Sequence, residues 1–420
     1  MTKISYISAQ EAVRAVRSGD HVHLSSIASV PQILVEALAG RASELQDVHF
    51  HHFHTEGAAP YAEGDPFFDQ GFFVGPNVRK NVQEGLADYI PVNLFETQSM
   101  YRNGALRCDV ALVQVSEPVD GMVSLGTSVD CSIAALEVAR ERIAVVNPNV
   151  PFAYGDLVPI ERFTALVKGD TPLITKEYAQ PSQTDQAIGR HCAELVPDGA
   201  CLQMGIGAMP NAICACLRDH KHLGLHTEMF SDGALQLIQD GIIDNSCKVI
   251  DTGKVVASFL LGSQKVYDFV DRNPAVLMKE IAYTNDPWNI ARNPGMVSIN
   301  SAIEIDLTGQ VCADSIGTRI YSGSGGQLDF VRGAKLSKGG MAIIAMASQT
   351  TKGMPKIVPT LKPGAGVVTP RADVQWVVTE FGAVNLYGKS LQERARLLIG
   401  IAHPDHREAL ERAAFERFGR

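Results

Sequence analysis

Paired cysteines, long apolar runs and an excess of basic residues are all missing from this chain of 420 residues. Its eight cysteines form no C-x-x-C pair, so the disulfide framework of a small secreted domain is not expected, and we predict reduced thiols in the cytoplasm. No uninterrupted apolar stretch approaches the length of a membrane span, and the first ten residues lack the apolar core of a signal peptide. We therefore predict a soluble protein with no membrane partner.

The charge balance is acidic, with 46 Asp and Glu residues against 37 Lys and Arg residues and a formal net charge of −9. Nucleic-acid binding requires a basic face, so no nucleic-acid partner is expected, although a local basic pocket for phosphate groups stays open. Hydrophobic residues make up 45% of the chain, which provides ample material for a core. At this length we expect more than one domain.

The two halves of the chain share a short pattern. Gly19 and Gly199 stand 180 positions apart, while Pro31 and Pro210 stand 179 apart. Each pair belongs to the same succession of helix end, glycine turn, short apolar strand, loop and a helix opened by proline, a position where the missing proline N–H costs nothing. The repetition predicts two related α/β domains.

Apolar runs separated by helical stretches favour parallel sheets. We expect strands at 110–115, 143–147 and 254–261, a helix at 132–141, and in the last third strands at 296–305, from 311 onward, at 341–347 and at 367–379. The turn at Leu307–Gly309 predicts mixed or antiparallel strands in addition to the mostly parallel sheet of the second domain. The fold class is therefore α/β, with two related domains.

A polar stretch containing proline, 168–182, is the expected linker between the domains. It divides the chain into an N-terminal domain, 1–180, and a C-terminal domain, 181–420. The tail, 389–418, is expected to be helical with a break at 403–405.

A glycine turn in the second half is the first candidate for chemistry. Gly205, Ile206, Gly207, Ala208 and Met209 lie between an apolar strand and the helix that Pro210 opens. Glycines allow a ligand to approach the backbone, and free amides at a helix N-terminus attract an anion or an oxyanion. A dinucleotide fingerprint would place a third glycine where proline stands, and a plain strand-to-helix turn is the alternative.

A carboxylate follows this turn. Glu228 lies in His226-Thr227-Glu228, and the same tripeptide occurs in the first half as His54-Thr55-Glu56. A carboxylate beside free backbone amides can attack a thioester carbonyl, although a glutamate that only favours a helix N-terminus would look the same. The first half has Ser25–Ala28 in place of the glycines, so the pairing of carboxylate and amide loop selects Glu228 over Glu56.

A loop of small residues is the third candidate. Ser322, Gly325 and Gly326 lie in the stretch 321–330, between apolar runs, where bare backbone can form an anion-binding nest. Lys338 follows and could neutralise a phosphate, although a solvated surface charge is the usual role of such a lysine. A flexible surface loop is the alternative.

Three histidines, His51, His52 and His54, stand close together in the first half. Strand alternation would place His52 and His54 on one face, which provides two metal ligands. No third ligand stands at a suitable spacing, so we predict no metal site.

Longer segments now carry a family resemblance. LQMGIGAMPNAI, LGLHTEMFSDG, GQVCADSIG, SGSGGQLDFVRGA, SKGG, VVTEFGAVNLYGKSLQERA and IAHPDHRE resemble family I coenzyme A transferases, in the acetyl-CoA hydrolase/transferase branch that includes 4-hydroxybutyrate CoA-transferase. The resemblance runs nearly from end to end. It implies a CoA-transferase that moves CoA between short-chain carboxylic acids, such as 4-hydroxybutyrate, butyrate, acetate, propionate, succinate or itaconate.

The resemblance also implies roles for particular residues. Glu228 corresponds to the glutamate that carries CoA as a glutamyl thioester in a ping-pong mechanism, and the CoA contacts correspond to Gly205, Ile206, Gly207, Ala208, Met209, Asn300, Ser322, Gly325, Gly326 and Lys338. No permanent cofactor is implied, because CoA enters as a substrate and becomes a covalent intermediate. Family members are commonly homodimers or higher assemblies, so we expect a homo-oligomer.

Three alternatives remain open from the sequence. An acyl-CoA hydrolase would use the same site and admit water to the glutamyl intermediate. A nicotinamide dehydrogenase would need the dinucleotide fingerprint that Pro210 interrupts. A binding or assembly protein would form no covalent adduct with an acyl-CoA.

Overall fold

The computed structural model describes residues 5–419 and divides into two compact units. The N-terminal unit runs to Glu177 and includes Val256–Thr284, while the second unit contains Tyr178–Val255 and the chain from Asn285 onward. The whole of 181–420 was expected in the second domain, whereas the segment 256–284 lies in the N-terminal unit. A strand pattern shows that a segment is extended but not which sheet it joins.

Backbone pairing explains why this segment belongs to the N-terminal unit. Strand β16 (Val276–Met278) pairs in parallel with β8 (Tyr154–Gly155). The amide of Leu260 also donates to the carbonyl of Thr127 at 2.8 Å. These bonds satisfy the extended backbone inside the first unit, as a buried polar backbone requires.

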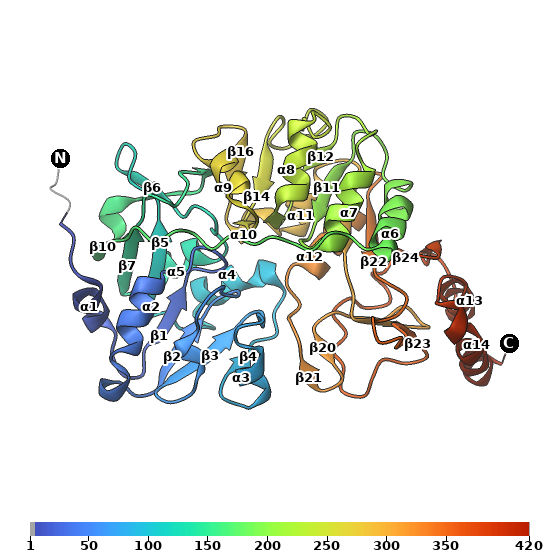
Figure 1. Cartoon of the computed structure of the whole chain (residues 1–420), viewed down its shortest axis with the longest axis horizontal. Helices are drawn as coiled ribbons and strands as arrows, with labels where there is room; N and C mark the ends of the chain where they lie inside the picture. Colours follow the sequence, from blue (N-terminus) through green and yellow to red (C-terminus); the bar gives the residue numbers. More distant parts are fainter. Residues whose placement is uncertain (1–4, 420) are drawn as a thin grey trace. The chain divides into compact units, whose positions relative to one another are not determined.

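The N-terminal unit contains a sheet of seven strands, and all of its neighbouring strands run parallel (Figure 1). Their order across the sheet is β10 (Ala165–Lys168), β7 (Glu141–Val146), β5 (Val110–Val115), β1 (His21–Leu24), β2 (Val48–His51), β3 (Phe67–Gly71) and β4 (Asp88–Tyr89). The helices of the unit are α1 (Ala9–Ala12), α2 (Gln32–Ala39), α3 (Arg79–Gln83), α4 (Leu94–Arg102), α5 (Ser132–Val138), α9 (Gln264–Val270) and α10 (Ile281–Thr284).

The second unit contains a sheet of six strands, in which only the last pair is antiparallel. Their order is β12 (Gly224–Leu225), β11 (Cys201–Met204), β17 (Met296–Asn300), β22 (Met341–Ala345), β24 (Trp376–Thr379) and β25 (Gly382–Asn385). The helices of the unit are α6 (Gln183–Ala193), α7 (Ala208–Cys216), α8 (Asp232–Gln239), α11 (Pro287–Ala291), α12 (Gln327–Leu336), α13 (Leu391–Gly400) and α14 (Pro404–Phe418).

Short strands complete the two units. In the second unit β18 (Glu304–Asp306) pairs antiparallel with β19 (Val311–Cys312) and parallel with β23 (Ile357–Val358). The others are β6 (Met122–Ser124), β9 (Leu157–Pro159), β13 (Met229–Phe230), β14 (Val255–Ala257), β15 (Phe259–Leu260), β20 (Ser315–Ile316) and β21 (Arg319–Ile320). The predicted fold class, two α/β domains with additional mixed strands in the second, is confirmed.

The sequence repeat corresponds to a repeated βα unit. In each unit the first strand of the pattern, β1 or β11, is followed by a helix with a proline near its start: Pro31 is the N-cap of α2, and Pro210 is the third residue of α7, which begins at Ala208 rather than at the proline. Gly19 and Gly199 both adopt the left-handed conformation, with φ of 77° and 76°. Glycine enters this region without strain, which explains its recurrence just before each strand.

Several predicted segments have different bounds in the structure. The run 296–305 is two strands in two sheets, and 254–261 is interrupted between Ala257 and Phe259. Only Trp376–Thr379 of 367–379 is a strand, and the helix predicted over 132–141 ends at Val138 because Glu141 begins β7. Apolar composition identified the buried residues, but strand ends depend on pairing partners that it does not reveal.

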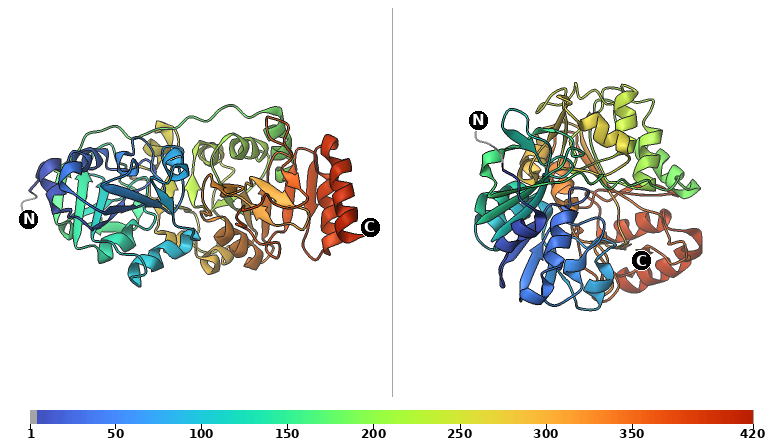
Figure 2. Two further views of the ribbon diagram at one scale, coloured as in Figure 1. Left: turned by 90° about the horizontal axis from the view of Figure 1, so that it is seen from below. Right: turned by 60° about the vertical axis from the view of Figure 1, so that its left-hand side comes forward.

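The expected linker is extended. Between the end of β10 and α6 the chain forms no helix or strand, and Figure 2 shows this connection as a long bare ribbon. The helical tail is also present: α13 and α14 lie side by side in both views of Figure 2 and are separated by residues 401–403, where the expected break was 403–405. Ser390 and Glu393 form a capping box that begins α13, as such a pair does where first-turn amides need acceptors.

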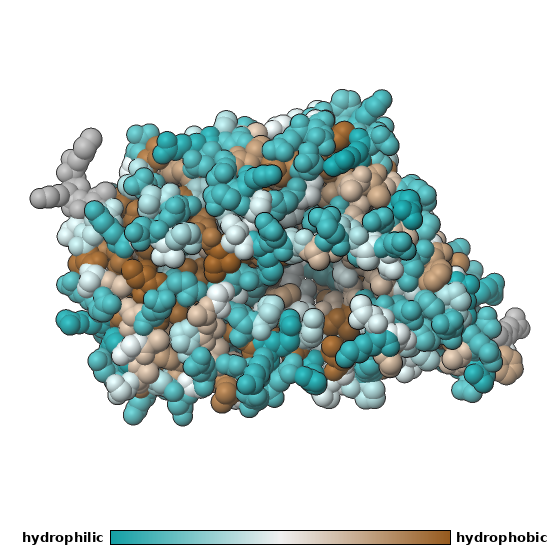
Figure 3. All heavy atoms as spheres, in the orientation of Figure 1, coloured by the Kyte–Doolittle hydropathy of each residue, from teal (hydrophilic) through white to brown (hydrophobic). Residues whose placement is uncertain are grey.

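The face drawn in Figure 3 is mostly hydrophilic, and hydrophobic residues gather over part of the N-terminal unit at the left of the view. Among residues 5–419, no helix is long and apolar enough to cross a lipid bilayer.

Two histidines are buried in the sheet of the N-terminal unit. His23 on β1 lies between the hydroxyl of Tyr101, 3.1 Å from Nδ1, and that of Ser132, 2.9 Å from Nε2. Burial lowers the pKa of His23 to about 4 and the pKa of His51 to about 3. Both side chains are therefore neutral in the folded protein at pH 5, where the unfolded chain would protonate them.

We predict that these two histidines destabilise the fold in mild acid. Stability is lost as pH falls below about 6.5, so at pH 5 each residue costs about 2 kcal/mol of unfolding free energy. The double variant His23→Gln/His51→Gln should lose less stability between pH 7 and pH 5 than the parent protein, as measured by urea unfolding. His191→Gln, at a partly exposed histidine, should keep the parent slope; equal slopes for parent and double variant would contradict the prediction.

Candidate active site

Glu228 lies beyond the carboxyl end of β12, an edge strand of the six-stranded sheet of the second unit. It follows β12 after two residues, and the amide of His226 donates to the carbonyl of Leu202 on β11 at 3.1 Å. The Thr227 hydroxyl donates to the carbonyl of Met204 at 3.2 Å. The tripeptide is thus hydrogen-bonded to the last residue of the strand that leads into Gly205.

Two hydrogen-bond donors contact the Glu228 carboxylate. Nδ2 of Asn285 donates to Oε2 at 2.8 Å, and the backbone of Gly326 provides a second hydrogen bond. Asn285 is completely buried, and its Nδ2 also lies 3.3 Å from Oδ2 of Asp329. As a residue Glu228 is partly buried, and the two donors hold its carboxylate in one orientation.

The surroundings favour the protonated form of this carboxyl group. The pKa of Glu228 is raised to about 7, mainly by burial and also by the nearby charge of Asp329, while the hydrogen bonds from Asn285 and Gly326 oppose this rise. Desolvation disfavours the charged form, and donors to the carboxylate favour it. The result is a carboxylate that is more basic than an ordinary glutamate, as a nucleophile requires.

Gly326 allows the backbone to approach the carboxylate. A Cβ atom at this position would overlap Oε2 of Glu228 and Nδ2 of Asn285. Gly326 is the N-cap of α12, where backbone amides are free of intrahelical partners. The absence of a side chain therefore keeps one amide donor within reach of Glu228.

The glycine turn forms a pocket with the end of the neighbouring strand. The pocket has a volume of about 290 Å³ and is lined by Met204, Gly205, Ile206, Gly207, Ala208, Met209, Pro210, Ile213, Ile299, Asn300 and Ser301. This volume is near the lower end for small-molecule sites, about 300–1,000 Å³. All five predicted residues of the turn and Asn300 are thus brought together, as expected where parallel strands end at one edge of a sheet.

The other predicted CoA contacts are distributed differently. Gly325 and Gly326 end the small-residue loop immediately before α12, next to Glu228. The Ser322 hydroxyl donates to the carbonyl of Ala313 at 2.8 Å, inside the unit's own backbone network. Lys338 is exposed and its carbonyl accepts from Gly295, at the amino end of β17. Lys338 therefore lies near the amino end of β17, whereas the pocket lies at the carboxyl end of this strand, next to Asn300.

The rival carboxylate, Glu56, has different surroundings. Its Oε1 lies 2.9 Å from Nζ of Lys176 and 3.5 Å from Nε2 of His54. Burial alone would raise its pKa, but hydrogen bonds from His54 and Lys176 lower the pKa of Glu56 to about 2. A carboxylate neutralised in this way is a poorer nucleophile than Glu228.

The predicted histidine pair does not form one cluster. Nε2 of His52 lies 2.8 Å from Oδ1 of Asp69, whereas His54 faces Glu56. His51 is the last residue of β2, and its Nε2 lies 2.9 Å from Nδ1 of His21. Each imidazole thus has its own neighbour rather than a shared centre.

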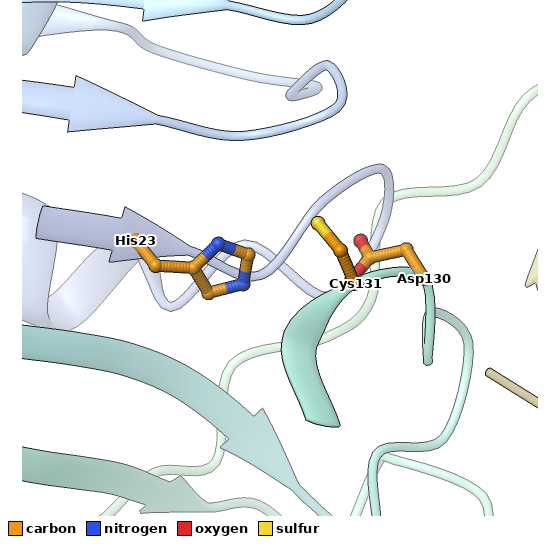
Figure 4. A group of neighbouring side chains, drawn as sticks. All are labelled: His23, Asp130 and Cys131. Carbon is orange, nitrogen blue, oxygen red and sulfur yellow. The ribbon is translucent and has the colours of Figure 1, made fainter. Parts of the chain in front are cut away.

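A different group of possible metal ligands lies in the N-terminal unit. Figure 4 shows His23 on β1 and the pair Asp130–Cys131 before α5, with ligand atoms within 4.8 Å of one another. Both nitrogens of His23 already have hydroxyl partners, and Oδ1 of Asp130 accepts from the amide and the hydroxyl of Ser132, each at 2.7 Å. Burial also raises the pKa of the Cys131 thiol well above its usual value. These contacts fit a buried hydrogen-bond network, which a metal ion would have to disrupt.

Three residues of the site, Asn285, Asp329 and Gln203, carry no clear signal in the sequence. Asn285 precedes the Asp286–Pro287 start of α11, a pattern that predicts only a turn and a helix start. Asp329 occupies the first turn of α12, where an acidic residue is common for helical reasons alone. Gln203 exchanges hydrogen bonds with Asn300 at 3.1 and 3.4 Å, and its position inside an apolar strand was the only available signal.

The chain matches two parts of one protein family. Residues 3–175 match the acetyl-CoA hydrolase/transferase N-terminal domain, and residues 262–414 match the acetyl-CoA hydrolase/transferase C-terminal domain. The chain therefore belongs to the acetyl-CoA hydrolase/transferase family. The resemblance inferred from the sequence and the predicted enzyme class are both confirmed.

Individual relatives cover nearly the whole chain. A succinyl-CoA:acetate/propanoyl-CoA:succinate CoA transferase of Fasciola hepatica is 47% identical over 96% of this chain and 86% of its own length. A 4-hydroxybutyrate coenzyme A transferase of Clostridium kluyveri is 42% identical over 99% of this chain and 98% of its own length. The crystal structure of a 4-hydroxybutyrate CoA-transferase from Porphyromonas gingivalis, 37% identical, superimposes with a TM-score of 0.84 over 98% of both chains.

We predict that a single methyl group at position 326 disables the site. Gly326→Ala should reduce acyl-CoA turnover by about a hundredfold or more, because the added carbon displaces Glu228 and Asn285 from their contact. Gly400→Ala, at a helix end where an added Cβ meets nothing, should keep the parent rate. Initial rates and thermal unfolding of both variants provide the test, and parent-like turnover in Gly326→Ala would show that the close approach is unnecessary.

Proposed function

We propose that this protein is an acyl-CoA:carboxylate CoA-transferase that acts on short-chain carboxylic acids through a glutamyl-CoA thioester on Glu228. The contact of the Glu228 carboxylate with Asn285 and the backbone of Gly326 carries the proposal. Family membership supports it, as do relatives named for transfer of CoA between succinate, acetate, propionate and 4-hydroxybutyrate. The acid that donates CoA and the acid that accepts it are expected to be among these four acids, butyrate and itaconate.

The first half of the reaction releases one acid. A carboxylate oxygen of Glu228 attacks the thioester carbonyl, the C–S bond breaks, and CoA leaves as a thiolate while an acyl-glutamyl anhydride forms. The thiolate then attacks the carbonyl carbon of Glu228, and the bond between this carbon and the bridging oxygen of the anhydride breaks. The acid leaves as a carboxylate, and CoA remains on the enzyme as a thioester, with no net proton taken up or lost.

The second half reverses these steps with another acid. Its carboxylate attacks the glutamyl carbonyl, CoA thiolate leaves and then attacks the new acyl group, and the Glu228 carboxylate is restored. When the glutamyl carbonyl is attacked, its oxygen becomes negative, and the donors from Asn285 and Gly326 are positioned to stabilise that charge. The pocket formed by the glycine turn and Asn300 is the proposed binding site for part of CoA, whose remote binding energy can be used at the reacting carbonyl.

The proposal gives CoA the roles of substrate and covalent intermediate, without a permanently bound cofactor. The resemblance also implies a cytoplasmic homodimer or higher assembly, and sedimentation of the purified protein would determine the number of subunits.

Removal of the nucleophile should separate binding from chemistry. Glu228→Ala should lower transfer by at least about a thousandfold, while CoA still binds, because only the attacking carboxylate is missing. Glu228→Asp should also be severely impaired, because one methylene of retreat spoils the attack geometry. Steady-state transfer rates and calorimetric CoA binding measure both effects. The proposal is wrong if Glu228→Ala keeps near-normal rates, and loss of all turnover in Glu56→Ala alone would identify the rival carboxylate instead.

The family description includes hydrolases, and water could attack the same glutamyl thioester. We expect transfer to dominate, so release of free CoA from an acyl-CoA should be slow alone, whereas added acetate or succinate should greatly accelerate the loss of the original acyl-CoA. A thiol reagent follows free CoA, and chromatography follows the new ester. Equal rates of CoA release with and without an acceptor acid would favour the hydrolase.

A further inference from the structure

We propose that Asp329 is a positioning residue for Glu228, because it holds the Asn285 amide with its nitrogen facing the nucleophile and places a fixed negative charge behind that amide. The inference rests on the proposed function of Glu228 and extends it to a residue that does not touch the carboxylate itself. Asp329 acts through Asn285, which lies between the two acidic side chains.

One nitrogen atom of Asn285 lies close to both acidic side chains. Nδ2 of Asn285 lies 2.8 Å from Oε2 of Glu228 and 3.3 Å from Oδ2 of Asp329. An amide nitrogen carries two hydrogens, whereas the amide oxygen carries none. One hydrogen is therefore available for each carboxylate, and a flipped amide would present its oxygen to both of them. Asp329 thus selects the orientation in which Asn285 can donate to Glu228.

Burial makes this selection strong. Asn285 has no exposed surface and Asp329 is 5% exposed, so water cannot replace either partner freely. An unsatisfied polar group in such a place costs more than the same group at the surface. The amide orientation is consequently determined by the protein rather than by solvent.

A helix stabilises the charge of Asp329. The residue stands in the first turn of α12, three positions after the N-cap Gly326, and the N-terminus of a helix favours a negative charge. Helix capping alone would explain an acidic residue here. It would not explain the contact with Asn285, which joins Asp329 to the candidate active site.

The charge of Asp329 also affects the nucleophile directly. Burial is the main cause of the raised pKa of Glu228, and the charge of Asp329 acts in the same direction. Other titratable groups lie on the neighbouring elements: His226 precedes the nucleophile and packs against the ring of Phe330, and Asp232 begins α8. Further along α12, Arg332 and Lys335 form ion pairs with Asp373 at 3.5 and 2.8 Å.

Two substitutions separate the charge from the hydrogen bond. Asp329→Asn keeps an oxygen that accepts from Asn285 but removes the charge, and Asp329→Ala removes both. In the parent protein, kcat/KM should rise with pH around the Glu228 pKa of about 7. In Asp329→Asn the midpoint of this rise should move down by about one pH unit, because a like charge has been removed.

Asp329→Ala should move the midpoint in the same direction and also lower kcat at high pH by about tenfold, because the Asn285 amide loses its orientation. The KM for acyl-CoA should stay within about twofold of the parent value, since Asp329 contacts Asn285 rather than CoA. A purely structural role would lower stability without moving the pH midpoint. Asp373→Asn, which removes a carboxylate next to the far end of α12, should keep the parent midpoint.

Thermal unfolding of each variant shows whether it is folded, and Asp329→Ser provides a second uncharged variant with a hydroxyl acceptor if Asp329→Asn does not fold. An unchanged midpoint in the folded, uncharged variants would overturn the inference, provided that Glu228→Ala is inactive. Activity in Glu228→Ala would instead overturn the proposed function itself, so the two failures are distinguishable.

Discussion

The candidate site depends on the close approach of one carboxylate to two donors, the Asn285 amide and the backbone of Gly326. The approach requires that position 326 carries no side chain, since a Cβ there would overlap both partners. It also brings a charged group into surroundings that favour its neutral form. The same contact therefore orients Glu228 and keeps it basic, which are the two properties that the proposed nucleophile needs.

The parallel sheet of the second unit determines where this contact can form. Strands β11 and β17 end side by side, so the glycine turn, Asn300 and the tripeptide containing Glu228 come to the same edge. The start of α12 carries Gly326 and Asp329, and Asn285 is the residue before the N-cap of α11. Both helix starts lie next to Glu228. Carboxyl ends of parallel strands are a common location for ligand sites because loops and helix N-termini gather there.

Sequence reasoning succeeded where a local pattern has one physical meaning. The glycine turn before Pro210 and the βα repeat marked by Gly19 and Gly199 could be predicted in this way. The preference for Glu228 over Glu56 stays a prediction, and the structure gives the two carboxylates opposite pKa shifts. The role of Asn285 could not be predicted, because it depends on a contact with Glu228, which lies 57 positions earlier in the chain (285 − 228). The neighbours of Lys338 and the unit that contains 256–284 could not be predicted for the same reason, because periodicity identifies an element but not its neighbours.

The central claim is that CoA becomes covalently attached to Glu228. The most direct measurement is to incubate the protein with an acyl-CoA, reduce the thioester with borohydride or cleave it with hydroxylamine, and map the modified peptide by mass spectrometry. The account predicts a single modification at Glu228, in the peptide containing His226-Thr227-Glu228. A modification at another residue, or none with any of the short-chain acyl-CoA esters, would contradict it.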